Sequence, residues 1–224
     1  MEEKIVAFFE LSKIFEQKGY HLYLVGGTVR DILLNLPLTD MDVVTDANPD
    51  EMKFFVEGDY TFSRMGSVKC KVNDVRIDIT TLRKEKHYKD YRHPATIRFV
   101  KDLKKDYVRR DFTINAMYMD KHFELIDYCH GLSDLNSRLI RMVGNPKKRI
   151  KEDPLRILRA IRFSLTYDFV IEPHLEKAMI QSIKLLDRLS KDKIKQEIRK
   201  INCLDNRKKE EIFSRYSIKY LLEL

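Results

Sequence analysis

Two aspartates in the segment LTDMDVVT have the type and spacing of residues that do chemistry. Asp40 and Asp42 are separated by one residue, and residues two apart on a β-strand project from the same face. Like charges this close raise one another's pKa unless a cation lies between them. The pair therefore predicts either a solvent-exposed strand edge or a site for a doubly charged cation.

A glycine pair upstream supplies the second part of this pattern. Gly26-Gly27 follows the apolar run HLYLV and leads into TVRDILLNL, which reads as a helix. Glycines let backbone N–H groups approach a phosphate, and a helix N-terminus attracts the anion. Arg30 adds a guanidinium one turn later. A Gly-Gly pair alone is most often a plain turn, but with Asp40 and Asp42 it predicts a nucleotidyl-transfer site, where Mg²⁺ binds carboxylates and substrate phosphates.

Asp78 is the candidate for a third carboxylate. In VRIDITT, apolar side chains alternate with polar ones, so Asp78 is an acid on a half-buried strand. It would bind a second metal ion or remove the proton of an attacking hydroxyl. The spacing alone leaves open the alternative of a solvent-facing aspartate beside Arg76.

The segment KEDPLRILRAIRF, residues 151–163, predicts a helix with Asp153 as N-cap and Pro154 as its first residue. Arg156, Arg159 and Arg162 recur every three residues on the face opposite the apolar side chains. The alternative is a capped helix with a solvated basic face. Against it, arginine occurs at each position, and arginine suits planar, bidentate recognition.

Asp153 and Arg156 lie one helical turn apart and present an acceptor and a donor together. Cytosine and adenine each offer an amino donor next to a ring-nitrogen acceptor, whereas uracil and guanine carry a ring N–H at that place. A mismatch would leave buried polar groups unpaired, which is costly. The pair therefore predicts a choice of C and A without a nucleic-acid template.

The segment YVRRDFTINAM, residues 107–117, is a further candidate. Arg109 and Arg110 would hold a triphosphate, and Asp111 would orient an arginine or bind the ribose. The alternative is a helix capped by Asp111.

These side chains need a fold that positions them. Helical patterns cover residues 3–18, the segment after Gly27, and residues 48–56. Strand patterns cover residues 21–25, 41–45, 60–64, 68–72 and 75–81, with a hairpin turn at Asn73-Asp74. The basic segment 83–105 reads as a loop, a strand and a short helix, and the chain after Leu132 reads as helical except for DFVIE. We expect an α+β fold: a mixed or antiparallel sheet flanked by helices over residues 1–131, then an all-α domain over residues 132–224.

The composition indicates which kinds of partner and which compartment to expect. The 224 residues carry a net charge of +8, from 43 Lys+Arg against 35 Asp+Glu, which suits a polyanion. The three cysteines have no metal-site spacing and read as thiols in a reducing compartment. We find no signal peptide and no apolar run of roughly 20 residues, so we expect a cytoplasmic protein with no membrane partner.

Together, and in this order, the motifs resemble the class II tRNA nucleotidyltransferase (CCA-adding enzyme) and bacterial poly(A) polymerase superfamily. The likeness runs through LVGGTVRDILLNLPLTDMDVVT, RIDITT to VRRDFTINAM, and IDYCHG to RAIRF, and more faintly through SKDKIKQEIRKI. The resemblance implies a nucleotidyltransferase head at residues 1–131 and a helical neck at residues 132–224.

The resemblance also implies roles for individual residues. Asp40 and Asp42 would bind Mg²⁺, and the position of Asp78 is usually Glu in this family, which puts its part in question. The EDxxR motif that pairs with the incoming base falls on Glu152, Asp153 and Arg156. The nucleotide-binding positions implied besides these are Gly26, Gly27, Arg30, Arg110, Arg159 and Arg162.

The expected activity is template-independent addition of C and/or A to the tRNA 3′ end from CTP and ATP, by two-metal phosphoryl transfer with release of pyrophosphate. Two alternatives stay open: a poly(A) polymerase acting on RNA 3′ ends, and a non-catalytic RNA-binding relative. A small-molecule nucleotidyltransferase would share the glycine pair and the aspartates but would not need EDxxR. The resemblance also implies that members restricted to adding CC lack a flexible loop between the DxD strand and RRDF, so the full-length segment 83–105 argues against addition of CC alone.

Family members usually continue past the neck into helical body and tail regions that grip the tRNA, whereas this sequence stops at Leu224. We therefore expect a short or absent body and tail. Two alternatives stay open: the remainder is missing from this sequence alone, or the protein holds RNA differently, through a homo-oligomer or a partner subunit.

Overall fold

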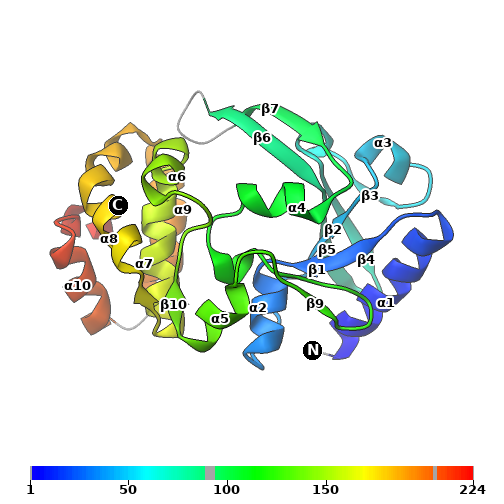
Figure 1. The fold of residues 1–224 in the computed structure, drawn as a ribbon, viewed down its shortest axis with the longest axis horizontal. Coiled ribbons are helices and arrows are strands. Elements are labelled where there is room, and N and C mark those ends of the chain that lie inside the picture. The colour runs from blue at the N-terminus through cyan, green and yellow to red at the C-terminus, as the bar shows by residue number, and fades with distance from the viewer. Residues whose placement is uncertain (1, 89–93, 204–205, 224) are drawn as a thin grey trace. The chain divides into compact units, whose positions relative to one another are not determined.

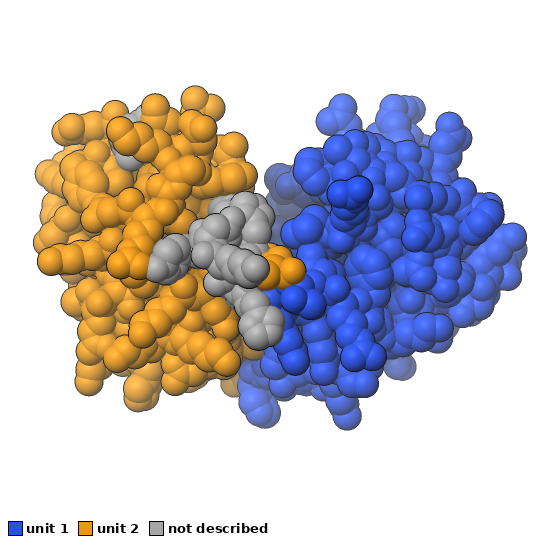
Figure 2. Space-filling model, turned by 90° about the horizontal axis from the view of Figure 1, so that it is seen from above, with its two compact units in different colours: residues 1–86, 96–110, 114–132 blue, residues 87–95, 111–113, 133–224 orange. Residues whose placement is uncertain are grey.

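The computed structural model describes residues 2–88, 94–203 and 206–223. Its chain forms two compact units, coloured blue and orange in Figure 2. Unit 1 takes residues 1–86, 96–110 and 114–132; unit 2 takes residues 87–95, 111–113 and 133–224. The division is not a single cut in the sequence, and the assignment of a head at 1–131 and a neck at 132–224 stays a prediction.

Unit 1 is built on a seven-stranded sheet with the order β3-β4-β5-β2-β1-β8-β9 (Figure 1). β2 and β5 are parallel, and every other pair of neighbours is antiparallel. The expected mixed sheet with flanking helices is therefore confirmed. The strands are β1 (Leu22–Val25), β2 (Asp42–Thr45), β3 (Gly58–Asp59), β4 (Ser67–Val72), β5 (Val75–Thr81), β8 (Tyr118–Met119) and β9 (Leu125–Ile126).

One face of this sheet is covered and the other is open along β4 and β5. On β5 the apolar side chains of Val75, Ile77 and Ile79 are buried, while Arg76 is exposed and Asp78 half-buried. Helix α1 (Glu2–Gln17) packs on β1, β4 and β5 with a buried apolar stripe. Since successive strand residues alternate between faces, Asp78 lies on the face away from α1.

Two short helices and a hairpin turn connect strands of the sheet. α2 (Gly27–Leu33) follows β1, and α3 (Pro49–Met52) starts at a capping box and ends earlier than predicted. At the β4–β5 turn Asn73 and Asp74 have φ of 46° and 64°. Positive φ at both central residues is what a tight type I′ turn requires, and the predicted hairpin is confirmed.

The predicted strand at residues 60–64 is wrong. Oδ1 of Asp59 accepts hydrogen bonds from the N–H and the hydroxyl of Thr61, at 2.8 and 2.6 Å, and such side-chain bonds begin a turn. A 3-10 helix (Ser63–Met65) follows. The strand at this sheet edge is β3 instead, where a Cβ on Gly58 would lie 2.4 Å from the carbonyl oxygen of Lys69.

The basic segment contains more regular structure than predicted. β6 (Arg83–Tyr88) and β7 (Pro94–Phe99) form a two-stranded sheet, and α4 (Leu103–Asp106) follows. The strand and short helix are confirmed, but the loop is wrong at residues 83–88, where β6 pairs with β7 and the largely buried side chains of Arg83 and Glu85 form an ion pair at 2.8 Å. Residues 89–93 of the predicted loop lie outside the described residues.

Unit 2 is mainly helical. It also contains a parallel pair of short strands, β10 (Leu139–Ile140) and β11 (Val170–Ile171); the segment DFVIE predicted β11 and nothing predicted β10. Within the unit, α6 packs on α8, and α7 on α9. The helices are α5 (Gly131–Asn136), which starts in unit 1, α6 (Pro146–Glu152), α7 (Leu155–Tyr167), α8 (Pro173–Ser182), α9 (Lys191–Asn202) and α10 (Asn206–Arg215).

Candidate active site

Asp42 and Asp78 lie beside each other in unit 1. They are partners in the parallel register of β2 and β5, so their side chains emerge from the same face of the sheet. Burial, together with the negative charges of Asp78 and Asp40, raises the pKa of Asp42 to about 6, although Arg110 opposes the shift. The arrangement is the one expected of carboxylates that share a cation or a proton.

Asp40 reaches this site by a different route from the one expected. It lies in a bend before β2 and is exposed, so the expectation that it projects beside Asp42 from the same face of one strand is wrong. Thr28 holds this stretch instead. Its buried hydroxyl accepts the N–H of Asp42 at 2.9 Å and donates to the carbonyl oxygen of Asp40 at 3.5 Å.

The turn at Gly26-Gly27 lies close to the carboxylate of Asp42. Gly26 has φ 67° and ψ −128°, a conformation that side chains disfavour. A Cβ on Gly26 would lie 3.8 Å from Nη1 of Arg110 and 3.9 Å from Oδ2 of Asp42. A Cβ on Gly27 would lie 3.3 Å from Nη2 of Arg30. Glycine, acid and arginine therefore converge at the end of β1.

The two arginines of unit 1 are held in place by their own partners. Arg30 is buried and donates from Nη1 to Asn115 at 2.5 Å and from Nε to Asp31 at 2.9 Å. Arg110 donates to Oδ2 of Asp106 from Nε and Nη2, at 3.2 and 3.0 Å. Both guanidinium groups are thereby fixed before any ligand arrives.

Asp106 is the anchor of Arg110 and is fully buried. The Tyr118 hydroxyl donates to it at 2.8 Å, and Nε of Arg109 at 2.8 Å. Burial alone would raise the pKa of Asp106, but the charges of Arg109 and Arg110 outweigh it and hold that pKa well below its usual range.

In unit 2, Asp153 joins α6 to α7. Helix α7 begins at Leu155, one residue later than predicted, with Pro154 in the N-cap position. Asp153 still caps the helix start, because its Oδ1 accepts the N–H of Leu155 at 3.1 Å. The N–H of Arg156 donates to the carbonyl oxygen of Asp153 at 3.2 Å, so the two residues of the expected base-reading pair are local neighbours.

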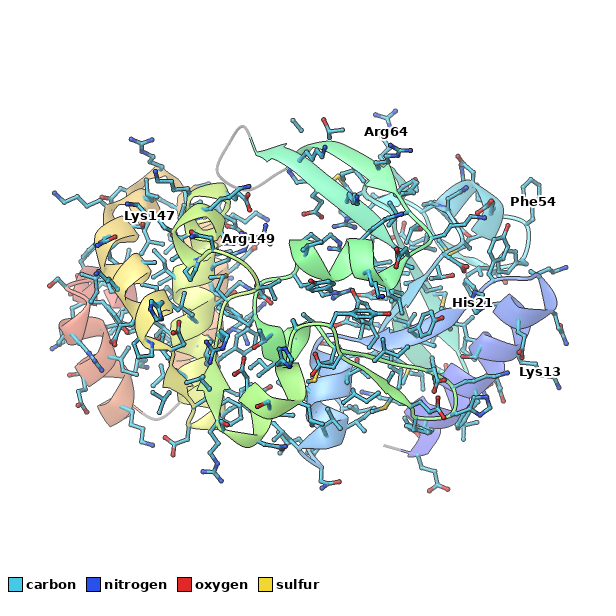
Figure 3. The ribbon with its side chains drawn as sticks, in the orientation of Figure 1. Lys13, His21, Phe54, Arg64, Lys147 and Arg149 are labelled. Carbon is cyan, nitrogen blue, oxygen red and sulfur yellow. The ribbon has the colours of Figure 1, made fainter. Side chains whose placement is uncertain are left out.

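The arginine stripe is not a solvated face. Arg156 is buried, donates to the carbonyl oxygen of Arg149 at 2.5 Å and pairs with Glu152 at 3.6 Å; Figure 3 labels Arg149 on α6. Arg159 donates from Nε to Asp111 at 2.8 Å, and Arg162 binds Glu197.

Asp111 and Phe163 support this stripe. Burial would raise the pKa of Asp111, but Arg159 holds it well below its usual range, so Asp111 orients an arginine, as one of its two predicted roles required. It does not start a helix. The guanidinium groups of Arg159 and Arg162 lie 5.5 and 4.2 Å from the ring centroid of Phe163.

The described residues contain no group of three or more His, Cys, Asp or Glu side chains arranged to hold a metal ion. None of their helices has the length and apolarity required to cross a membrane.

Comparison with known proteins identifies the family. A sequence model of the poly A polymerase head domain matches residues 22–141, more than half of the chain. The chain belongs to the poly A polymerase head-domain family. The resemblance drawn from the motifs is therefore confirmed.

Relatives of the family are similar along most of this chain. The CCA-adding enzyme of Staphylococcus haemolyticus is 43% identical over 192 residues, which are 85% of this chain and 48% of that protein. The CCA-adding enzyme of Lactobacillus helveticus is 41% identical over 187 residues, 83% of this chain and 47% of that one. The chain thus spans about half the length of these relatives.

Solved structures show the same fold. The Bacillus stearothermophilus CCA-adding enzyme in complex with CTP matches with a TM-score of 0.80 and 31% identity, over 90% of this chain and 48% of that one. The Thermotoga maritima CCA-adding enzyme complexed with tRNA(CCA) matches with a TM-score of 0.74 and 30% identity, over 94% and 50%. The family's fold therefore extends over both units of this chain.

The motifs missed the residues that hold the site together. Thr28, Asn115, Asp106 and Tyr118 were not singled out, and each hydrogen-bonds to a predicted site residue. Thr28 directly follows the glycine pair, and that position was its only signal. The partners of Arg30 and Arg110 come from distant or unremarkable sequence positions that carry no local pattern.

Proposed function

We propose that this chain is a template-independent tRNA nucleotidyltransferase, which adds C and/or A to the tRNA 3′ end from CTP and ATP and releases pyrophosphate. One observation carries the proposal: Asp42 and Asp78 pair in register beside Gly26 and Arg110. The relatives support the substrates, since their structures include complexes with CTP, ATP and tRNA.

The carboxylates fit a magnesium site. Mg²⁺ takes oxygen ligands and needs only one or two carboxylates when substrate phosphates supply the rest, and the charge crowded around Asp42 matches such a cation. Asp40 and Asp42 are the proposed ligands. When bound, Mg²⁺ would neutralise this charge and polarise the phosphate oxygens.

The remaining groups of unit 1 would bind the triphosphate and prepare the nucleophile. Gly26 and Gly27 present backbone N–H groups, and Arg30 and Arg110 present guanidinium groups of fixed orientation, which suit phosphate oxygens. In the reaction the RNA 3′ oxygen forms a bond to the α-phosphorus while the bond to the pyrophosphate oxygen breaks. We assign to Asp78 the removal of the hydroxyl proton, which it passes to solvent.

The base would be read by Asp153 and Arg156, with Arg159 and Arg162 as further nucleotide contacts. A carboxylate accepts about four hydrogen bonds, so the bond from Leu155 leaves capacity for a base amino group on Asp153. Arg156 is already fixed by Arg149 and Glu152, and such preorganisation penalises a mismatched base.

A second candidate is poly(A) addition to RNA 3′ ends, which the description of the matching family favours. The two activities differ in product. A CCA-adding enzyme stops after a few nucleotides and uses CTP, whereas a poly(A) polymerase extends with ATP alone.

The deciding experiment is primer extension on a tRNA that lacks its 3′ terminus. The protein is incubated with Mg²⁺ and with CTP, ATP, both, UTP or GTP, and products are resolved nucleotide by nucleotide. We expect short defined products with CTP and/or ATP, none with UTP or GTP, and none from Asp42→Asn. A long ladder with ATP alone would indicate poly(A) addition, and absence of pyrophosphate release would indicate a non-catalytic relative. The cytoplasmic location and an oligomer or partner subunit stay predictions.

A further inference from the structure

The open face of the sheet carries two cations beside the catalytic acids. Lys69 on β4 is the cross-strand partner of Asp78, and Arg76 lies two residues before Asp78 on the same face of β5. Both side chains are exposed. They line a surface depression together with Asp40, Gly58 and Asp78.

Lys69 and Arg76 differ from the other cations around the site in having no fixed partner. Within residues 2–88, 94–203 and 206–223, neither side chain makes an ion pair or a side-chain hydrogen bond, whereas the neighbouring Lys71 pairs with Asp74 at 2.5 Å. Glu57 also lines the depression. Since Arg30 and Arg110 are already held by acids, Lys69 and Arg76 are the cations whose charge is most open to a new anion.

The order of the strands shows on which side of the catalytic acids these cations lie. From β1 to β4 the sheet runs β1, β2, β5, β4. The groups proposed for the triphosphate gather at the end of β1, Asp42 and Asp78 lie on β2 and β5, and Lys69 lies beyond them on β4. An in-line displacement has the attacking and leaving oxygens on opposite sides of the phosphorus. The nucleophile should therefore arrive from the β4 side when pyrophosphate leaves on the β1 side.

We propose that Lys69 and Arg76 bind the phosphate backbone of the RNA 3′ end that carries the attacking hydroxyl. This inference rests on the proposed function, and it gives the acceptor strand a binding surface separate from that of the incoming nucleotide. The contacts are with phosphates, so they position the strand without reading its sequence. The surface belongs entirely to unit 1.

The kinetic test compares Lys69→Ala, Arg76→Ala and the double variant with the unchanged protein. For the double variant we expect the KM for a tRNA lacking its 3′ terminus to rise about tenfold or more, while the KM for CTP changes less than twofold. The salt dependence of RNA binding should weaken by about 1.4 in log–log slope, at about 0.7 for each single-strand phosphate contact. Lys69→Arg and Arg76→Lys should keep most of the affinity.

Lys13→Ala is the matched control, because Lys13 is an exposed cation on α1, which covers the opposite face of the sheet (Figure 3). It should leave both KM values unchanged. If the double variant and Lys13→Ala have the same KM for RNA, these two cations form only a solvated surface and the inference is wrong.

A binding measurement separates this inference from the proposed activity. Fluorescence anisotropy of the labelled tRNA is recorded in EDTA and without nucleotide, so no turnover is required. Loss of affinity in the double variant supports the inference even if the protein incorporates no nucleotide. Equal affinity overturns it, even if incorporation by the unchanged protein supports the proposed function.

Discussion

The acids of unit 1 and the arginines of unit 2 are placed by opposite means. Asp42 and Asp78 come together through strand register, and their like charges are left close enough to raise the pKa of Asp42. In unit 2, Arg156, Arg159 and Arg162 are each matched with an acid, and Asp111 shows the reverse shift in pKa. The acids of unit 1 therefore carry charge that a bound cation would neutralise, whereas the arginines of unit 2 are already neutralised by acids of the protein.

The largest effect should come from the uncompensated acids. Asp42→Asn keeps the size of the side chain but removes the charge that a cation would balance. We expect incorporation of CMP to fall by at least about a thousandfold, with no loss of thermal stability because a repulsive charge is removed. Retained turnover, or a lower melting temperature, would place Asp42 among the structural charges instead.

The next effect concerns the choice of base. Asp153→Ala or Arg156→Ala removes one half of the proposed reading pair. We expect the ratio of kcat/KM for CTP over UTP to fall by about a hundredfold. Lys147→Ala, at an exposed position on α6, the helix that precedes Asp153, is the control and should keep the ratio. Full selectivity in both substituted proteins would show that the pair is structural only.

Thr28 tests whether backbone placement of the acids matters for turnover. Thr28→Val keeps the shape but removes the hydroxyl that binds the N–H of Asp42. We expect kcat to fall by about tenfold with the KM for CTP little changed, because a small displacement of a reacting group is costly. Thr28→Ser should restore kcat. An equal loss in both variants would indicate a packing defect.

Replacing an acid that neutralises buried arginines should lower the free energy of unfolding rather than change the choice of base. Asp106→Asn removes the buried carboxylate that pairs with Arg109 and Arg110, although Glu85 still pairs with Arg109 at 3.5 Å, and we expect the free energy of unfolding to fall by about 3 kcal/mol. Asp74→Asn breaks only the exposed pair with Lys71 and should leave the free energy of unfolding nearly unchanged. Urea unfolding measures both. Equal small losses would contradict the distinction between the two kinds of pair.

The smallest effect is the pH dependence of the loss in unfolding free energy caused by Asp106→Asn. The pKa of Asp106 is lowered in the folded protein. Its contribution to stability is therefore complete above the pKa that an aspartate has in the unfolded chain, near 4. The contribution declines as the pH falls from there through the pKa of Asp106 in the folded protein. The stability gap between the unchanged protein and Asp106→Asn should therefore be constant from pH 5 to 7 and narrow below about pH 4. A gap that widens toward low pH would reverse the sign of the shift.

The sequence predicted the elements whose signals are local. The Asn73-Asp74 hairpin, helix α1 and the alternation along β5 follow from turn chemistry and periodicity. The strand expected at 60–64 failed because side-chain bonds from Asp59 form a turn there. β6 was missed because its charge resembles that of a loop.

Among the site residues, the acids and glycines were found because their types are rare in such positions. Asp78 was predicted as a third carboxylate of the same site, but its spacing alone left a solvent-facing position open, because strand order brings Asp42 and Asp78 together across a stretch of sequence that no local pattern bridges. Asp106 and Asn115 act only as partners of arginines, and an isolated buried acid or amide gives no signal until the contact is seen.

A double-substitution cycle on Asp42 and Asp78 tests most directly whether the paired acids act as one catalytic unit. Single-turnover rates of CMP incorporation into a tRNA lacking its 3′ terminus are measured for Asp42→Asn, Asp78→Asn and both together, over a range of Mg²⁺ concentrations. Residues that act as a unit lose most of the rate at the first substitution, so the double variant should be about as slow as the slower single variant. Losses that multiply, or an Asp78→Asn protein with an unchanged rate, would contradict the shared role.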